Sequence, residues 1–222
     1  MEKPTIQGVF VDFGNVCATF DFGRFLDGFA GHTGKDRTHI EHTLCGGVAN
    51  GKNYSKLFAS FECGEIAPAN FFHVLTQSLD CRHTIDYHTF AKLWAGIFIE
   101  ENTELDKLLF QIPQKKFLLS NINAISYGRY VAESQIVRNH FRLEEQRLLS
   151  YRIGAIKPHP QVYYAAFKRA GLHPTHTLFI DDVEENIAAW KSLGGHGIVY
   201  NATKHSISDL TRQLRDYSIV IG

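Results

Sequence analysis

Six polar side chains of the kinds that take part in phosphoryl transfer come after short apolar runs of the chain. They are Asp12, Ser120, Asn121, Lys157, Asp181 and Asp182. A carboxylate such as Asp12 can attack phosphorus and form an acyl phosphate that water later hydrolyses. Neighbouring carboxylates would repel it unless a divalent cation lay among them, and a set of oxygen ligands suits Mg²⁺. A hydroxyl, backbone amides and a lysine can hold the other phosphate oxygens.

Each of these residues also has a plainer interpretation. An aspartate at the end of a strand commonly belongs to a turn, an acidic pair commonly begins a helix, and a lysine before a proline is commonly solvated. Their common position after apolar runs, and their order along the chain, favour one shared site over these separate explanations.

The apolar runs have the composition of buried strands. Strands are expected at residues 8–11, 116–119, 177–180 and 196–200, with a weaker candidate at 147–151. Runs without polar alternation suit strands covered on both faces, as in a parallel sheet. Helical patterns lie between them, for example at 161–170 and 184–193. We therefore expect an α/β fold with a doubly wound, Rossmann-like and mostly parallel sheet, which binds ligands at the carboxyl ends of its strands.

The stretch from residue 17 to residue 99 has a different pattern. Helices are expected at 22–29 (with Asp21 as N-cap), 54–61, 69–79 and 87–98, and loop signals lie at 45–47 and 49–51. This stretch contains no good strand candidate. We predict an α/β core domain made of residues 1–16 and 100–222, and an inserted all-helical cap domain made of residues 17–99.

Composition narrows the class of protein further. The 23 basic and 23 acidic residues balance, so no electrostatic footprint for nucleic acid or an anionic membrane is present. The polar start at residues 1–5 and the short apolar run after it resemble neither a signal peptide nor a membrane helix. We expect a cytoplasmic protein with a small-molecule partner, and no oligomeric state is predicted. Cys17, Cys45, Cys63 and Cys81 lack zinc-site spacing and are expected to be structural thiols.

Four motifs in order resemble those of the haloacid dehalogenase (HAD) superfamily. They are residues 9–16 (an apolar strand, Asp12 and then Phe13, Gly14, Asn15 and Val16), 117–121, 154–160 and 178–182. The insertion between the first two is similar to the helical cap of that superfamily, and residues 61–66 resemble one of its cap segments. The Asp-x-Gly-Asn-Val form of the first motif resembles the α-D-glucose-1-phosphate phosphatases.

This resemblance implies a role for each site residue. Asp12 would be the nucleophile, with Lys157 as a second catalytic residue. The Mg²⁺ ligands would be Asp12, the backbone carbonyl of Gly14, Asp182 and, directly or through water, Asp181. The phosphate would be bound by Ser120, the amide of Asn121 and Lys157. The cap would close over the site, exclude water and select the substrate.

The chain departs from the superfamily pattern at Gly14. An aspartate usually stands there and acts as general acid to the leaving oxygen, a contribution of typically 10²–10⁴-fold. Three explanations stay open: another group supplies the proton, the substrate has a better leaving group such as an anomeric sugar oxygen, or turnover is poor. The next residue, Asn15, replaces a usual glycine and tolerates a positive φ.

These observations predict a Mg²⁺-dependent phosphatase that acts on small phosphorylated metabolites. We expect sugar phosphates, with anomeric ones as a specific candidate, and an aspartyl-phosphate intermediate on Asp12. One alternative is a dehalogenase of the same superfamily, which attacks carbon and needs no metal; the pair Asp181 and Asp182 disfavours it. A second alternative is a catalytically weak regulator that binds phosphorylated metabolites.

Overall fold

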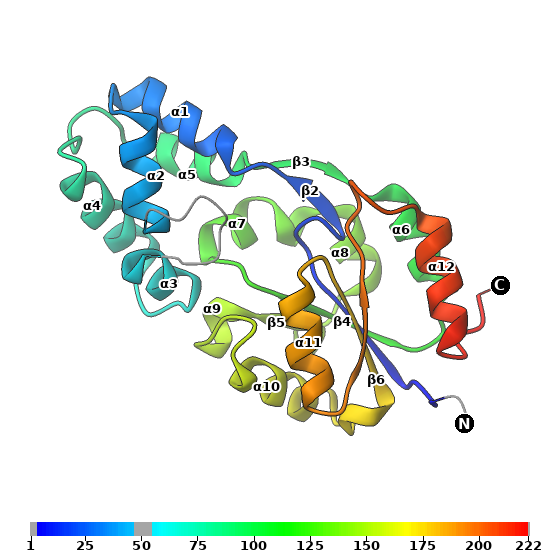
Figure 1. Cartoon of the computed structure of the whole chain (residues 1–222). Helices are drawn as coiled ribbons and strands as arrows, with labels where there is room; N and C mark the ends of the chain where they lie inside the picture. Colours follow the sequence, from blue (N-terminus) through cyan, green and yellow to red (C-terminus); the bar gives the residue numbers. More distant parts are fainter. Residues whose placement is uncertain (1–3, 47–54, 222) are drawn as a thin grey trace.

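The computed structural model describes residues 4–46 and 55–221. Its centre is a five-stranded parallel sheet with the strand order β5-β4-β1-β6-β7 (Figure 1). The strands are β1 (Gly8–Val11), β4 (Lys115–Ser120), β5 (Arg147–Leu149), β6 (Thr177–Asp181) and β7 (His196–Val199). The predicted α/β fold class is confirmed, and each of the five predicted strands is present.

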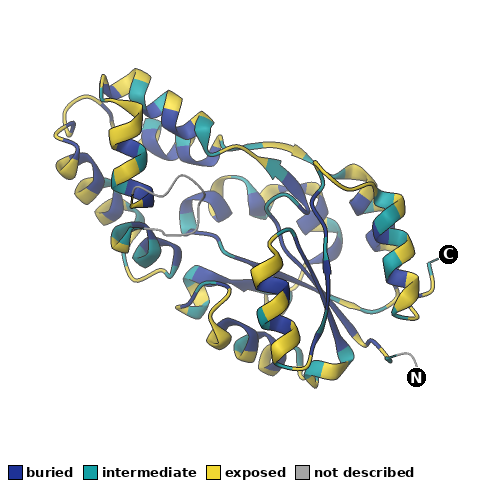
Figure 2. Ribbon diagram, viewed as in Figure 1, coloured by how far each residue is buried: buried dark blue, intermediate teal, exposed yellow. Residues whose placement is uncertain are grey.

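Helices cover both faces of the sheet, which explains the continuous apolar runs. All four residues of β1 are buried. Val9 and Val11 pack into one hydrophobic cluster with side chains of α6 (Thr103–Gln111), α8 (Gln135–His140) and α12 (Ile207–Asp216). Phe10 faces the other way, into a cluster with α10 (Pro160–Ala170) and α11 (Glu184–Ser192). Figure 2 shows the strands buried between these two layers.

A separate layer of helices lies beyond one end of the sheet (Figure 1). It consists of α1 (Gly23–Thr33), α2 (Arg37–Cys45), α3 (Lys56–Glu62), α4 (Pro68–Ser78) and α5 (Tyr87–Ala95). The layer has its own hydrophobic cluster, in which Phe25 and Trp94 pack with ring centroids 4.7 Å apart. Asp36, Ser55 and Asp86 cap α2, α3 and α5 by accepting backbone N–H bonds. The division of the chain into domains at residues 17 and 99 stays a prediction.

Short helices complete several of the connections between these elements. They are α7 (Ala124–Arg129) and α9 (Ser150–Ile153), and single turns of 3-10 helix lie at Val131–Glu133, Glu144–Gln146 and Pro174–His176. Over the described ranges no helix is long and apolar enough to cross a membrane.

The prediction of no strand between residues 17 and 99 is wrong at both ends. β2 (Ala18–Phe20) pairs antiparallel with β3 (Phe98–Glu101), and this ribbon joins the helical layer to the sheet. The two strands are too short to show a period, and each depends on a partner about eighty residues away. α5 consequently ends at Ala95 rather than at residue 98.

The cap of α1 and two expected loops differ from, or lie outside, what the structure describes. Asp21 is not the N-cap of α1, a position that Phe22 occupies, although its Oδ1 accepts the Gly23 amide at 2.8 Å. The expected loop at residues 49–51, residue 47 of the loop at 45–47 and the start of the helix at 54–61 lie outside the described residues. The four cysteines are free thiols.

Candidate active site

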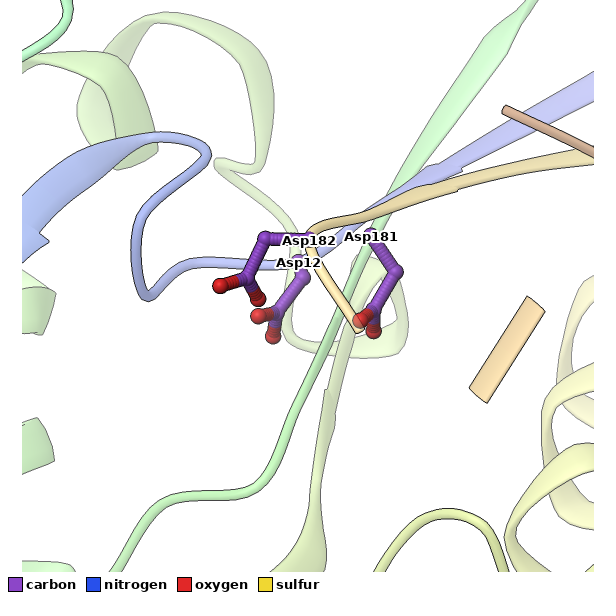
Figure 3. Close-up of side chains that lie close together, drawn as sticks. All are labelled: Asp12, Asp181 and Asp182. Atoms are coloured by element: carbon purple, nitrogen blue, oxygen red, sulfur yellow. The ribbon is translucent and has the colours of Figure 1, made fainter. Parts of the chain in front are cut away.

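Three carboxylates meet where β1 and β6 end. The two strands are parallel and pair Val11 with Ile180, so the next residues, Asp12 and Asp181, lie side by side. Asp182 follows directly, and oxygens of the three carboxyl groups lie within 4.8 Å of one another. Figure 3 shows these side chains pointing to the same side of the strand ends. The structure thus brings together the three predicted acidic residues.

Lys157 lies against two of these carboxylates. Its Nζ donates to Asp12 Oδ1 at 2.8 Å, to Asp181 Oδ2 at 2.6 Å and to the carbonyl of Leu119 at 3.1 Å. Burial alone would lower the pKa of Lys157, but Asp12 and Asp181 raise this pKa above its usual value. The buried ammonium therefore stays charged and offsets part of the negative charge of the carboxylates.

Two of the carboxyl groups, Asp12 and Asp182, hold protons more readily than usual. Burial raises the pKa of Asp12 to about 7, and Asp181 and Asp182 add to this rise while Lys157 opposes it. Burial, and then the charge of Asp181, raise the pKa of Asp182. A divalent cation would relieve this repulsion, and a donor set made only of oxygens fits Mg²⁺. Among the described residues this is the only cluster of three or more acidic, histidine or cysteine side chains suited to a metal ion.

Asparagines hold the acidic pair in place. Asp181 Oδ1 accepts from the Val183 amide at 2.8 Å and from Asn186 Nδ2 at 2.9 Å. Asp182 Oδ2 accepts from Asn15 Nδ2 at 3.2 Å and from Asn201 Nδ2 at 3.3 Å. Our sequence analysis missed Asn201. Its position just after β7, at the same edge of the sheet, is the signal that would have found it.

The side chain of Asn121 binds the backbone of Lys157, a contact that the resemblance did not imply. Its side chain accepts from the Lys157 amide at 2.8 Å and donates to the Lys157 carbonyl at 3.1 Å. This pair of bonds fixes the backbone that carries Lys157, and therefore the direction from which the ammonium reaches Asp12. Ser120, the last residue of β4, is buried beside it.

The site opens into a cavity of about 380 Å³ between the sheet end and the helical layer. From the sheet side it is lined by Asp12, Gly14, Ser120, Asn121, Lys157 and Asp182, and Asp181 lies beneath these. Aromatic rings from the ribbon and the helical layer form much of the opposite wall: Phe20, Phe22, Phe58, Trp94 and Phe98. Glu62 brings a carboxyl group to the cavity from the end of α3. The sequence analysis included Glu62 in a cap-like segment but assigned no chemistry to it.

The sequence and the fold of the chain are similar to those of known proteins. No family model matches the chain. A D-ribitol-5-phosphate phosphatase from Bacteroides thetaiotaomicron is 25% identical over 200 residues, which cover 85% of this chain and 89% of that protein. A crystal structure of the HAD family enzyme BT-2542 from the same organism, in complex with magnesium and inorganic phosphate, is also 25% identical. It has a TM-score of 0.75 and covers 92% of this chain and 98% of its own. Together these matches support the HAD superfamily of hydrolases for this chain.

More distant HAD structures agree in fold. A HAD-like family hydrolase from Porphyromonas gingivalis is 23% identical with a TM-score of 0.77, over 95% of this chain and 98% of its own. The L-2-haloacid dehalogenase of Xanthobacter autotrophicus is 18% identical with a TM-score of 0.59, over 97% of this chain and 85% of its own. At this distance the likeness concerns the fold alone.

The departure of this chain at Gly14 has a structural counterpart. A Cβ atom at Gly14 would lie 2.9 Å from Cε1 of Phe20, a residue of the unpredicted strand β2. The Phe20 ring therefore fills the space into which a longer side chain at this position would extend. Asn15 adopts φ 53°, the left-handed conformation that was expected of it.

Proposed function

We propose that the chain is a Mg²⁺-dependent phosphatase that hydrolyses a small sugar phosphate or sugar-alcohol phosphate through an aspartyl-phosphate on Asp12. The observation that carries the proposal is the cluster of Asp12, Asp181 and Asp182 with Lys157 at the floor of a 380 Å³ cavity. The named activity of the D-ribitol-5-phosphate phosphatase and the magnesium and phosphate bound to BT-2542 support it.

The cation would be held by Asp12, the backbone carbonyl of Gly14 and Asp182. Bound there, Mg²⁺ would neutralise charge on the carboxylates and on the phosphoryl oxygens. Asp181 is fully buried and already accepts from Lys157, the Val183 amide and Asn186, so we assign it a positioning role through water and Lys157 rather than direct ligation.

Asp12 would act as nucleophile. One of its oxygens attacks phosphorus, the bond from phosphorus to the alcohol oxygen breaks, and water then hydrolyses the acyl phosphate. Lys157 holds the Asp12 carboxyl group in place through its bond to Oδ1. Ser120, the amide of Asn121 and Lys157 would bind the non-bridging oxygens, where preorganised donors stabilise the transferring group.

The cavity suits a leaving group with both apolar and polar parts. Phe22, Phe58 and Trp94 offer flat apolar surfaces to the C–H faces of a sugar or polyol. Asn123 and Glu62 offer polar contacts in the same cavity. Anomeric sugar phosphates remain a specific candidate because their leaving oxygen is more acidic than an ordinary alcohol. The relative named above, by contrast, acts on a phosphate ester of a sugar alcohol.

The test is a screen of phosphorylated metabolites with the purified chain, in Mg²⁺ and in excess chelator. It should compare anomeric sugar phosphates, primary-alcohol sugar phosphates and D-ribitol 5-phosphate. We expect turnover that is lost in chelator and lost in Asp12→Asn. Ester turnover that survives in chelator would contradict the Mg²⁺-dependent mechanism, and absence of turnover on every ester would leave the dehalogenase and the regulator.

A further inference from the structure

The leaving alcohol of the proposed reaction requires a proton. When the bond from phosphorus to an ordinary alkoxide oxygen breaks, that oxygen needs a proton, and Gly14 has no side chain to provide one. Among the described residues, the titratable side chains that line the cavity are Asp12, Cys45, Glu62, Lys157 and Asp182. One of these side chains, or a bound water, must donate the proton to the leaving oxygen.

Four of the five are poor donors. Asp12 is occupied as the nucleophile, and Asp182 belongs to the carboxylate cluster that would hold the cation. Asp12 and Asp181 raise the pKa of Lys157, so its ammonium releases no proton near neutral pH. Burial raises the pKa of the Cys45 thiol, which is a weak hydrogen-bond donor in any case. Glu62 is the lining side chain that remains.

Two contacts fix Glu62 at the junction of the helical layer and the sheet. Its Oε1 accepts from Asn123 Nδ2 at 2.6 Å, and its backbone carbonyl accepts from Ser150 Oγ at 2.7 Å. Asn123 cannot turn its amide around, because its Oδ1 already accepts from the amides of Ile125 and Ser126 at the start of α7. Asn123 therefore donates to Glu62, and the other carboxyl oxygen, Oε2, has no partner among the described residues.

The carboxyl group is also protonated more readily than an ordinary glutamate. Glu62 is only 5% exposed. Burial raises its pKa to about 7, against a smaller lowering by the Asn123 bond. Since Oε1 accepts from Asn123, the proton resides on Oε2. An acid whose pKa lies near the working pH is the most effective general acid.

We propose that Glu62 is the general acid of the reaction, a catalytic residue that the helical layer supplies in place of the missing side chain at position 14. The inference rests on the proposed phosphatase function. As Asp12 bonds to phosphorus, the electron pair of the breaking bond goes to the alcohol oxygen, which takes the proton from Glu62. After the alcohol leaves, solvent returns a proton to the Glu62 carboxylate. Water hydrolyses the aspartyl-phosphate and releases its proton to solvent, so the cycle closes with an alcohol and inorganic phosphate.

The test compares Glu62→Gln with the wild-type chain on three esters in Mg²⁺. Glutamine keeps an oxygen to accept the Asn123 bond but has no proton to transfer. Propyl phosphate has a poor leaving group and no hydroxyl, D-ribitol 5-phosphate has a poor leaving group and several hydroxyls, and p-nitrophenyl phosphate has a leaving group that needs no proton. We expect kcat to fall about 10²-fold or more on the first two esters and less than about 3-fold on the third.

The controls separate this inference from the proposed function. Glu65→Gln, at an exposed position whose carboxylate accepts from Ser60 Oγ of α3, should retain wild-type rates on all three esters. Equal losses on the three esters would assign Glu62 a structural role, and a loss confined to D-ribitol 5-phosphate would assign it to hydroxyl recognition; either result overturns the inference while the phosphatase stands. No turnover of any ester by the wild-type chain overturns both.

Discussion

Lys157 is the residue on which the charge balance of the site depends. It is the cation bonded to two buried carboxylates, Asp12 and Asp181, and its own side chain is 2% exposed. Removing one partner of a buried ion pair leaves uncompensated charge, which typically costs 3–5 kcal/mol. The same residue would bind phosphate, so its contributions to stability and to catalysis cannot be separated by activity measurements alone.

We therefore predict that Lys157→Met lowers the free energy of unfolding by about 3 kcal/mol in chelator and abolishes turnover. Urea unfolding measures the first effect. The matched control is Lys168→Met, an exposed position on α10, which should change stability by less than about 0.5 kcal/mol. Unchanged stability of Lys157→Met would contradict the charge balance described above.

Glu62 makes the stability of the chain depend on pH in a defined direction. Burial raises its pKa from 4.5 to about 7 in the folded chain, so between these values the folded state holds a proton that the unfolded state has lost. Stability from this group is fully present below about pH 4.5 and is lost as pH rises through about 7. The total effect is on the order of 3 kcal/mol.

We predict how the difference in unfolding free energy between the wild-type chain and Glu62→Gln changes with pH. In chelator, the unfolding free energy of the wild-type chain relative to Glu62→Gln should fall between about pH 5 and about pH 8. Asp12, whose pKa is also raised, titrates in both proteins and cancels in the comparison. A difference that stays constant or grows with pH would show that Glu62 is ionised in the fold.

At the scale of elements, the turn after α3 holds Glu62 against the sheet layer. Gly64 adopts φ +73°, and a Cβ atom there would run into the carbonyl oxygen of Tyr151 in α9. Any side chain would have to push the two elements apart, and a positive φ adds strain for residues other than glycine.

Gly64→Ala is therefore expected to destabilise the chain by about 1–3 kcal/mol and to lower kcat on alkyl phosphates more than on p-nitrophenyl phosphate. Gly31→Ala in α1 is the control, because a Cβ atom there meets nothing within 4 Å. It should leave activity unchanged and stabilise the helix slightly. Thermal unfolding and the same ester panel measure both effects, and similar behaviour of the two variants would contradict the close approach at Gly64.

Some elements were predictable from the sequence and others were not. The strands β1, β4, β6 and β7 were predictable because each is a continuous apolar run followed by polar residues, and the site residues follow their ends. The β2–β3 ribbon was not, because Phe20 and Phe98 pair across the chain without local periodicity. The role of Glu62 depends on a tertiary neighbour, Asn123, that no spacing in the sequence indicates, whereas the position of Asn201 just after β7 did offer a signal.

The whole molecule combines two hydrophobic clusters on the faces of a sheet with a third in the helical layer, and the cavity lies where sheet and layer meet. A ligand that binds only the folded state stabilises it by mass action, about 2.7 kcal/mol at a hundred times its Kd. For a chain of 222 residues this corresponds to a rise in Tm of roughly 5–10 °C.

Mg²⁺ should accordingly raise the Tm of the wild-type chain, and Asp182→Asn should remove most of that rise. Asp216→Asn, an exposed position at the end of α12, is the control and should keep the full shift. Differential scanning fluorimetry over a Mg²⁺ titration measures all three proteins. Equal shifts in the wild type and Asp182→Asn would place the cation elsewhere.

The central claim is that Asp12 accepts the phosphoryl group. The most direct measurement is an acid quench during turnover of p-nitrophenyl phosphate in Mg²⁺, followed by mass spectrometry of the peptide that contains Asp12. The account predicts one phosphoryl group on that peptide, sensitive to borohydride reduction as an acyl phosphate is, and absent in Asp12→Asn. Turnover with the phosphoryl group on another residue, or turnover that persists in Asp12→Asn, would contradict it.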